Sequence, residues 1–371
     1  MTNVYSYGES VLSKFTNLTE RVESDTLIPH QIEIHPPPKG KKLCWFGCKH
    51  CYTQTDIDES ERILGSRLVE IIDEVSNGSP KTGEKPEKLI ISGFRTDPLN
   101  SNTIFDVLEA SKRGKFVTGI HTKGLKLTDE LIEGLTRDNI EGDYISFSID
   151  AGNNLTYNKV HGVNNHQAIL YDQVRKNISR LMDKVRTSNS DLKVRLTYLL
   201  TNENCDEQVV DFIKHFSDLG VHTLRFSIPI LPTMGNQERN NDFPKVSVHD
   251  LKVFEERFYN LKKEDTDFVY LKFENNPHRV QPCWSRWLLP TIGYDGYLYP
   301  CCLVASKEFE SLRIADVKKV GFWDAYYKKV DLDLGLANCQ CDRKAAEIHD
   351  AVNYNLEKNK SQFGDDGNGR C

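Results

Sequence analysis

The sequence predicts an α/β fold: a partial (β/α)6 TIM-type barrel over residues 30–230, followed by a small cysteine-rich extension. Short runs of strand-forming residues alternate with amphipathic helical stretches throughout residues 30–230. Strands separated by helices form right-handed βαβ units, which build a parallel sheet. A second observation is the distribution of the cysteines, since six of the ten fall in the last quarter of the chain: Cys283, Cys301, Cys302, Cys339, Cys341 and Cys371.

The elements follow in a regular order. The strand candidates are residues 31–36, 88–92, 115–121, 143–149, 192–200 and 222–228. The helix candidates between them include residues 66–76, 129–137 and 207–220, where apolar residues recur at intervals of three and four. A polar stretch (231–244) then leads to a helix (247–263) and a strand (267–274). We therefore expect an N-terminal extension (1–29), the barrel (30–230), a connection (231–280) and a C-terminal attachment (281–371).

Composition excludes several classes of protein. The 48 basic and 54 acidic residues give a net charge of −6, which argues against a broad nucleic-acid-binding face. The N-terminus lacks the basic and apolar segments of a signal peptide, and no apolar stretch approaches the ~20 residues that span a bilayer. We expect a cytoplasmic protein with neither a nucleic acid nor a membrane as partner.

Cys44, Cys48 and Cys51 lie directly after the first predicted strand, with the spacing C-x3-C-x2-C. Barrels of this kind carry their chemistry at the carboxyl ends of the strands. Three thiolates on one tight loop can bind three irons of a [4Fe–4S] cube and leave the fourth iron open to a small molecule. The alternative is a zinc site with His50 or His35 as fourth ligand, although zinc sites more often pair two C-x2–4-C knuckles.

This loop, with the aromatic His50 before its third cysteine, resembles the signature of the radical S-adenosylmethionine (SAM) superfamily. ISGFRTDPL (91–99) resembles the family's second-strand motif without its usual Glu, and IHTKGLKL (120–127) resembles the third-strand motif with Lys123 in place of Asn. ISFSIDAGNNLTYNKVHG (145–162) and TYLLTNEN (197–204) resemble the fourth and fifth strands. The resemblance implies that the three cysteines hold a [4Fe–4S] cluster. It also implies that SAM binds the open iron and is cleaved reductively to a 5′-deoxyadenosyl radical.

Several residues are candidates for contact with the cofactor or the substrate. The candidate cofactor-binding residues are His50, Ser92, Gly93, Ser148, Asp150 and Arg195. Ser148 and Asp150 alternate along the fourth strand and so share one face, although Asp150 could instead cap a helix. Arg195 could pair with the SAM carboxylate or form a structural salt bridge. Cys205 could give a hydrogen atom to a substrate radical, or be a small buried apolar residue.

The C-terminal cysteines indicate a second metal site. Tyr-Asp-Gly-Tyr (294–297) predicts a hairpin turn in which Gly296 has a positive φ, so that Cys283 and Cys301 meet at the open end. With Cys339 and Cys341, four thiolates would complete a cluster without an open iron. This region resembles the SPASM and twitch extensions of radical SAM enzymes, which implies one auxiliary [4Fe–4S] cluster. Cys302 or Cys371 could replace a ligand, and a structural zinc site is the alternative.

We expect a radical SAM oxidoreductase that oxidises or crosslinks its substrate, with the auxiliary cluster as electron acceptor and a peptide as the favoured substrate. Only 43 residues precede Cys44, too few for the N-terminal winged-helix domain that binds the leader peptide in many peptide-modifying relatives. A small-molecule dehydrogenase or epimerase of natural-product biosynthesis is the alternative, and a non-catalytic zinc protein is the alternative of another class. A flavodoxin or ferredoxin is the expected external one-electron reductant.

Overall fold

The computed structural model describes residues 18–40, 44–51, 58–165, 167–229, 244–261, 267–270, 284–330, 348 and 350–356. Its central feature is one curved ten-stranded sheet with the order β10-β9-β8-β1-β2-β3-β4-β5-β6-β7. The strands are β1 Gln31–Ile34, β2 Lys88–Ile91, β3 Val117–Thr122, β4 Tyr144–Ser148, β5 Lys193–Leu199, β6 Thr223–Ser227, β7 Asp267–Tyr270, β8 Thr291–Ile292, β9 Tyr297–Tyr299 and β10 Ala315–Asp316.

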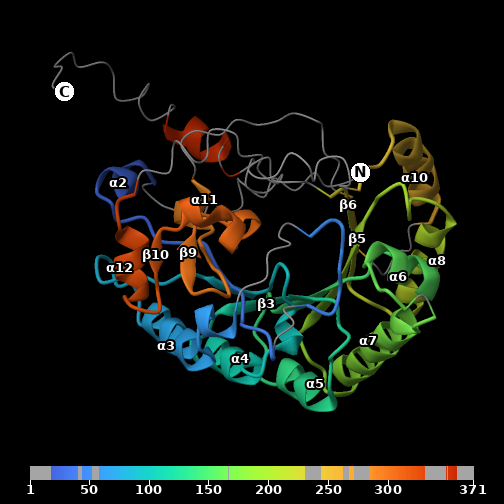
Figure 1. Cartoon of the computed structure of the whole chain (residues 1–371), viewed down its shortest axis with the longest axis horizontal. Helices are drawn as coiled ribbons and strands as arrows, with labels where there is room; N and C mark the ends of the chain where they lie inside the picture. Colours follow the sequence, from blue (N-terminus) through green and yellow to red (C-terminus); the bar gives the residue numbers. More distant parts are fainter. Residues whose placement is uncertain are drawn as a thin grey trace.

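Strands β1 to β6 confirm the predicted partial barrel. Each of them pairs in parallel with the next along the chain. The sheet continues into β7, which pairs in parallel with β6 and corresponds to the strand expected at 267–274. In Figure 1 the helices form an outer arc around this curved sheet, as the helices of βαβ units do.

Four helices lie where their periodicity predicts them, at residues 66–76, 129–137, 207–220 and 247–263. The helices between the strands are α3 Gly65–Ser76, α4 Ile104–Arg113, α5 Asp129–Thr136, α6 Asn154–Val160, α7 Leu170–Thr187, α8 Glu207–Asp218 and α10 Val248–Leu261. The shorter helices include α2 Leu18–Glu23, η1 Glu59–Glu61, η2 Pro98–Asn100, α11 Ser285–Leu288, η3 Cys302–Val304, η4 Lys307–Leu312 and α12 Phe322–Tyr327. No helix of the described residues is long and apolar enough to cross a membrane.

The two faces of the sheet differ in exposure, and strand β5 shows the difference most clearly. Val194, Leu196 and Tyr198 are fully buried on the face that packs against the helices. Arg195 and Thr197 alternate with them and are partly exposed on the concave face. A concave face lined by polar, accessible side chains is available to a cofactor or substrate.

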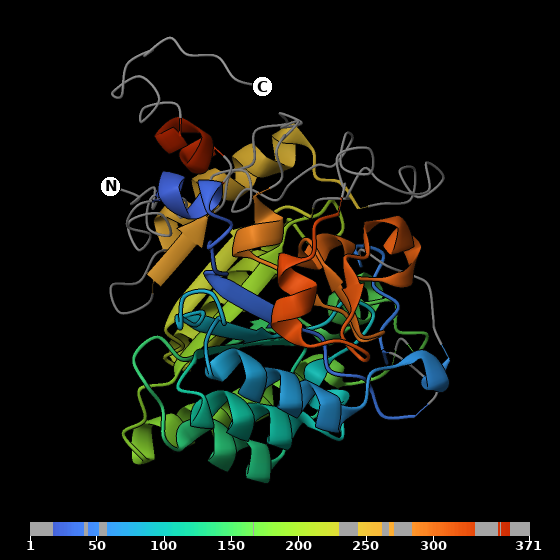
Figure 2. The same ribbon diagram turned by 90° about the vertical axis from the view of Figure 1, so that its left-hand side faces the viewer.

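Residues 284–330 of the C-terminal attachment (the extension) continue the same sheet. Strand β8 pairs in parallel with β1, and β9 and β10 follow in antiparallel order. Figure 2 shows the orange strands of the extension beside the blue strand β1. Gly296 has φ +77° in the β8–β9 turn, which confirms the predicted hairpin. Cys283, Cys339, Cys341 and Cys371 lie outside the described residues.

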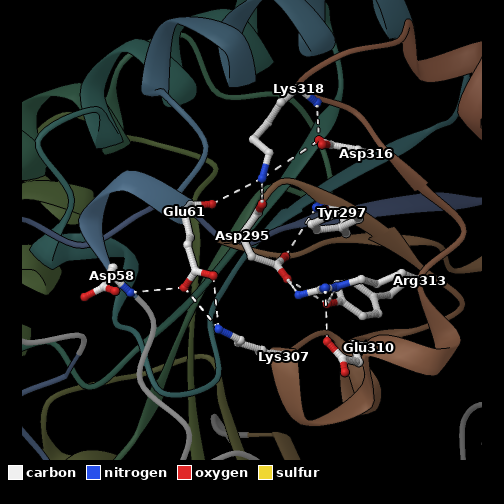
Figure 3. A network of polar contacts seen from close by, with 10 residues as sticks. Asp58, Glu61, Asp295, Tyr297, Lys307, Glu310, Arg313, Asp316 and Lys318 are labelled. Atoms are coloured by element: carbon white, nitrogen blue, oxygen red, sulfur yellow. Dashed lines mark hydrogen bonds and ion pairs between the residues drawn. The ribbon is translucent and has the colours of Figure 1, made fainter.

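A network of ion pairs connects the extension to η1, which follows the cysteine loop in the chain. The Lys307 ammonium group lies 3.0 Å from Oε1 of Glu61, and the Lys318 ammonium group donates to the Glu61 carbonyl oxygen at 3.2 Å. Arg313 pairs with Asp295 at 2.9 Å. Figure 3 shows these side chains around a small charged cleft of about 120 Å³. We call these five residues the extension network.

Candidate active site

The loop of residues 44–51 follows the carboxyl end of β1, as predicted, and presents alternating side chains inward and outward. Trp45 is 58% exposed, whereas Phe46 and Cys48 are 5% and 7% exposed. The Phe46 ring packs edge-on against Tyr157 and His161, with ring centroids 6.1 and 5.5 Å away. This aromatic contact fixes the loop on helix α6.

Backbone amides point at two of the three thiol groups. The Phe46 amide lies 3.5 Å from the Cys44 sulfur, and the Arg95 amide donates to the Cys51 sulfur at 3.2 Å. Burial raises the pKa of Cys44 to about 11 and that of Cys48 to about 12, so both thiols stay protonated until a metal replaces their protons. Three soft thiols on one loop, with amide donors aimed at sulfur, fit an iron–sulfur cluster.

Cys48 is contacted by the residues at the C-terminal end of α6. Its sulfur lies 3.3 Å from Nδ1 of His161, whose Nε2 lies 3.0 Å from the Ile149 carbonyl oxygen. The Gly47 amide donates to the His161 carbonyl oxygen at 2.9 Å. At Gly162, which has φ +60°, an added Cβ would lie 2.3 Å from the Gly47 oxygen. The two backbones therefore touch at a point where neither residue has a side chain.

The zinc alternative has a partial geometric basis. Ligand atoms of Cys48, His50 and His161 lie within 4.8 Å of one another. Nε2 of His161, however, already lies 3.0 Å from the Ile149 carbonyl oxygen, and Nε2 of His35 lies 3.1 Å from Glu33. Within the described structure, Nδ1 of His50 is buried without a hydrogen-bond partner, and burial lowers the pKa of His50 to about 4. His50 is therefore a neutral ring beside the cysteine loop.

Several polar side chains next to the cysteine loop contact the Asp150 carboxylate. Asp150 is fully buried and adopts φ +56°. Its Oδ2 lies 3.1 Å from the Lys123 ammonium group, 3.7 Å from Nε2 of His161 and 3.9 Å from Nε2 of His50. The Leu199 amide donates to Oδ1 at 2.8 Å. Asp150 therefore connects strands β4 and β5 with the cysteine loop.

One alternative for Asp150 is that it caps a helix, and the structure shows a different cap. The side chain that caps helix α6 is Asn153, which accepts from the Thr156 amide at 2.9 Å, and not Asp150. The Asp150 carbonyl oxygen instead accepts from the Asn204 side chain at 2.8 Å. Both carboxylate oxygens and the carbonyl oxygen of Asp150 are therefore hydrogen-bonded to protein groups.

The loop after β2 carries the candidate residues Ser92 and Gly93. The Ser92 hydroxyl group donates to the Glu33 carboxylate. An added Cβ at Gly93 would lie 1.9 Å from the hydroxyl oxygen of Thr96, so the loop folds tightly over this glycine. Asp97 closes the loop by accepting from the Lys123 amide at 2.7 Å and from the Thr122 hydroxyl group at 2.8 Å. The loops after β2 and β3 are therefore tied together.

Ser148 and Arg195 lie on the concave face of the sheet. Both are partly exposed, and the Arg195 guanidinium group stacks over the Tyr144 ring at 4.1 Å. The Tyr144 hydroxyl group lies 2.9 Å from Nε2 of His121. No carboxylate of the described residues lies within ion-pair distance of Arg195, so the structural salt bridge considered for it is not formed there.

Cys205 lies shortly before helix α8, two positions after Glu203, whose carboxylate is 3.5 Å from the ammonium group of Lys49 in the cysteine loop. Its sulfur lies 3.5 Å from the Asp250 carbonyl oxygen, and its partly buried side chain packs against the main core. Cys301 and Cys302 follow β9, and both are partly exposed and packed against the same core.

Sequence reasoning assigned no role to three residues that build this site: Lys123, His161 and Asn204. Lys123 had a visible signal, since it replaces the Asn of the third-strand motif. His161 directly precedes Gly162, the glycine that ends the fourth-strand motif, but its distance of 113 positions from Cys48 conceals their contact.

The comparisons with known proteins establish the class. Residues 42–242, more than half of the chain, match the Radical SAM superfamily. The chain belongs to this family and is an enzyme. The family implies a [4Fe–4S] cluster and SAM.

Particular relatives are more distant. The chain is 23% identical over 265 residues to the tungsten-containing aldehyde ferredoxin oxidoreductase cofactor-modifying protein of Pyrococcus furiosus, covering 70% of this chain and 68% of the relative. The fold of this chain is similar to that of Streptococcus suis SuiB bound to S-adenosylmethionine, with a TM-score of 0.62 and 13% identity. The match covers 86% of this chain and 70% of SuiB. The fold is also similar to that of native anSMEcpe with bound AdoMet, with a TM-score of 0.55, 12% identity, and coverage of 90% and 100%.

Proposed function

We propose that this enzyme oxidises or crosslinks a peptide by radical SAM chemistry, with Cys44, Cys48 and Cys51 as ligands of the SAM-binding cluster. The cluster and SAM together supply a 5′-deoxyadenosyl radical, which takes a hydrogen atom from a substrate carbon. The observation that carries this proposal is the three-thiol loop at the carboxyl end of β1, with amide donors aimed at its sulfurs.

The residues around the loop have distinct roles in this proposal. The tight turn at Gly93 lies next to the Arg95 amide that contacts Cys51, and its backbone groups would bind the amino group of SAM. Ser148 and Arg195 on the concave face bind polar groups of SAM, and Arg195 offers its cation to the SAM carboxylate. Because the oxygens of Asp150 are already bound by protein groups, we assign it to positioning the loop instead of contacting SAM.

The preference for a peptide rests on the fold. SuiB, which has also been solved bound to its precursor peptide SuiA, has a TM-score of 0.60 with this chain in that complex, at 13% identity and with coverage of 89% of this chain and 73% of SuiB. The extension adds an argument for oxidation, since Cys301 and Cys302 follow a hairpin whose first strand pairs with β1. We propose that Cys301, with Cys283, Cys339 and Cys341, holds an auxiliary cluster. The substrate radical would lose its electron to that cluster and a proton to solvent.

The test uses anaerobically reconstituted enzyme, SAM, dithionite and short peptides encoded beside its gene. We expect 5′-deoxyadenosine and a peptide that has lost two hydrogens. The Cys301→Ala variant should still cleave SAM but form no product. In deuterated water, solvent deuterium at the attacked carbon without net oxidation would contradict the proposal, because it would mean that a thiol such as Cys205 quenches the substrate radical.

A small-molecule substrate is the second candidate, and the Pyrococcus furiosus relative favours it because that protein is named as modifying a cofactor. The enzyme would then act on a small molecule, with a flavodoxin or ferredoxin as reductant in either case. Faster formation of 5′-deoxyadenosine with a deproteinised small-molecule extract, and no response to peptides, would favour this candidate.

A further inference from the structure

The third-strand motif that residues 120–127 resemble has Asn between its Thr and Gly, but this chain has Lys123 at that position, directly after β3. The Lys123 side chain is only 15% exposed, and its ammonium group lies 3.1 Å from Oδ2 of the fully buried Asp150. Both partners are fixed by further bonds. The Lys123 amide donates to Asp97 at 2.7 Å, and the Leu199 amide donates to Oδ1 of Asp150 at 2.8 Å.

A buried ion pair of this kind adds little stability by itself, because desolvation of the two charges offsets most of their attraction. Its effect on neighbouring groups is larger, because charges in a poorly hydrated interior are weakly screened. The pair lies next to the cysteine loop, since Oδ2 of Asp150 is 3.7 Å from Nε2 of His161, whose Nδ1 lies 3.3 Å from the Cys48 sulfur. Asp150 faces the two rings that border the same loop, His50 and His161.

We propose that Lys123 and Asp150 are positioning residues that set the reduction potential of the SAM-binding cluster through their opposite charges. This inference rests on the proposed cluster at Cys44, Cys48 and Cys51. Reduction adds one negative charge to the cluster, so the nearby cation favours the reduced state and the nearby carboxylate favours the oxidised state. The pair therefore adjusts how readily the cluster accepts the electron that SAM cleavage requires.

The test is a redox titration of the reconstituted enzyme without SAM, followed by electron paramagnetic resonance. We expect the midpoint potential of Lys123→Met to be more negative than that of the wild type, and that of Asp150→Asn to be more positive. The double variant K123M/D150N should lie between them, near the wild type. Lys123→Arg is the matched control, because it keeps the charge and should leave the potential close to the wild-type value.

Opposite shifts of the single variants are a readout that a merely structural role would not give. Shifts in the same direction, or no shift, would overturn the inference. If the single variants fail to hold iron, the pair is assigned to folding and the inference is overturned. Wild-type protein without iron would instead contradict the proposed cluster.

Discussion

Two sets of ion pairs in this protein have similar chemistry and very different surroundings. The pair of Lys123 and Asp150 is almost completely enclosed, with side chains 15% and 0% exposed. In the extension network, the side chains of Lys307 and Glu61 are 40% and 44% exposed (Figure 3). Exposed pairs contribute about 0–1 kcal/mol, whereas removing one partner of a buried pair costs about 3–5 kcal/mol.

This difference in exposure corresponds to two different roles of the ion pairs. Both carboxylate oxygens of Asp150 have fixed partners, Lys123 and the Leu199 amide, so the geometry next to the cysteine loop tolerates little change. In the extension network, Glu61 is contacted by two lysines at once, through its carboxylate and its carbonyl oxygen. Loss of one exposed contact leaves the other, and the pairing of β8 with β1 still attaches the extension to the barrel.

The largest expected effect comes from removing the loop's own thiols. In the C44A/C48A/C51A variant we expect about half of the iron to be lost, if two four-iron clusters are present, and SAM cleavage to be abolished. The control is C301A/C302A, which should still form 5′-deoxyadenosine. Equal loss of SAM cleavage in both variants would mean that the cysteine loop and the extension do not differ in their role in SAM cleavage.

The next effect concerns the stability of the two networks. Asp150→Ala should lower the free energy of unfolding by about 3–5 kcal/mol, because Lys123 is left buried without a counter-charge. Glu61→Gln should lower it by about 0–1 kcal/mol. Urea unfolding followed by circular dichroism measures both values, and equal losses would show that burial does not separate these networks.

A glycine comparison tests how closely the cysteine loop is held. Gly162 and Gly40 both have positive φ, +60° and +74°, but an added Cβ at Gly40 meets nothing within 4 Å. Gly40→Ala should cost about 1–2 kcal/mol for backbone strain alone. Gly162→Ala should cost about 1–3 kcal/mol more, because its Cβ collides with Gly47, and it should also lower iron content after reconstitution. Similar melting temperatures and iron contents for the two variants would contradict the close contact.

The smallest effect is the pH dependence of the extension network. The hydrogen bond from Lys307 holds the pKa of Glu61 below its ordinary value of 4.5. The contribution of this carboxylate to stability is therefore present above pH 4.5 and disappears as the pH falls through the lowered pKa. The difference in melting temperature between wild type and Glu61→Gln should be small at pH 7, smaller in high salt, and absent in acid. A difference that persists in acid would mean that Glu61 acts through packing.

The strands could be predicted because their signals are local. Apolar runs such as residues 192–200 produce the alternating burial seen on β5, and the Gly296 turn follows from its neighbours in sequence. The spacing of Cys44, Cys48 and Cys51 is likewise local. The contacts of Asp150 could not be predicted in the same way, because Lys123, Leu199 and His161 reach it from three separate segments. Such convergence is set by sheet register, which no single segment encodes.

The pairing of β8 with β1 has a consequence for biosynthesis. Strand β1 leaves the ribosome early, yet one of its neighbours, β8, is completed only when residue 292 has been made. Until then, that edge of β1 lacks its native partner, next to the loop that carries Cys44, Cys48 and Cys51. Contacts between such distant segments form late in folding. We therefore expect iron to be loaded after translation is nearly complete, well after the three cysteines have emerged.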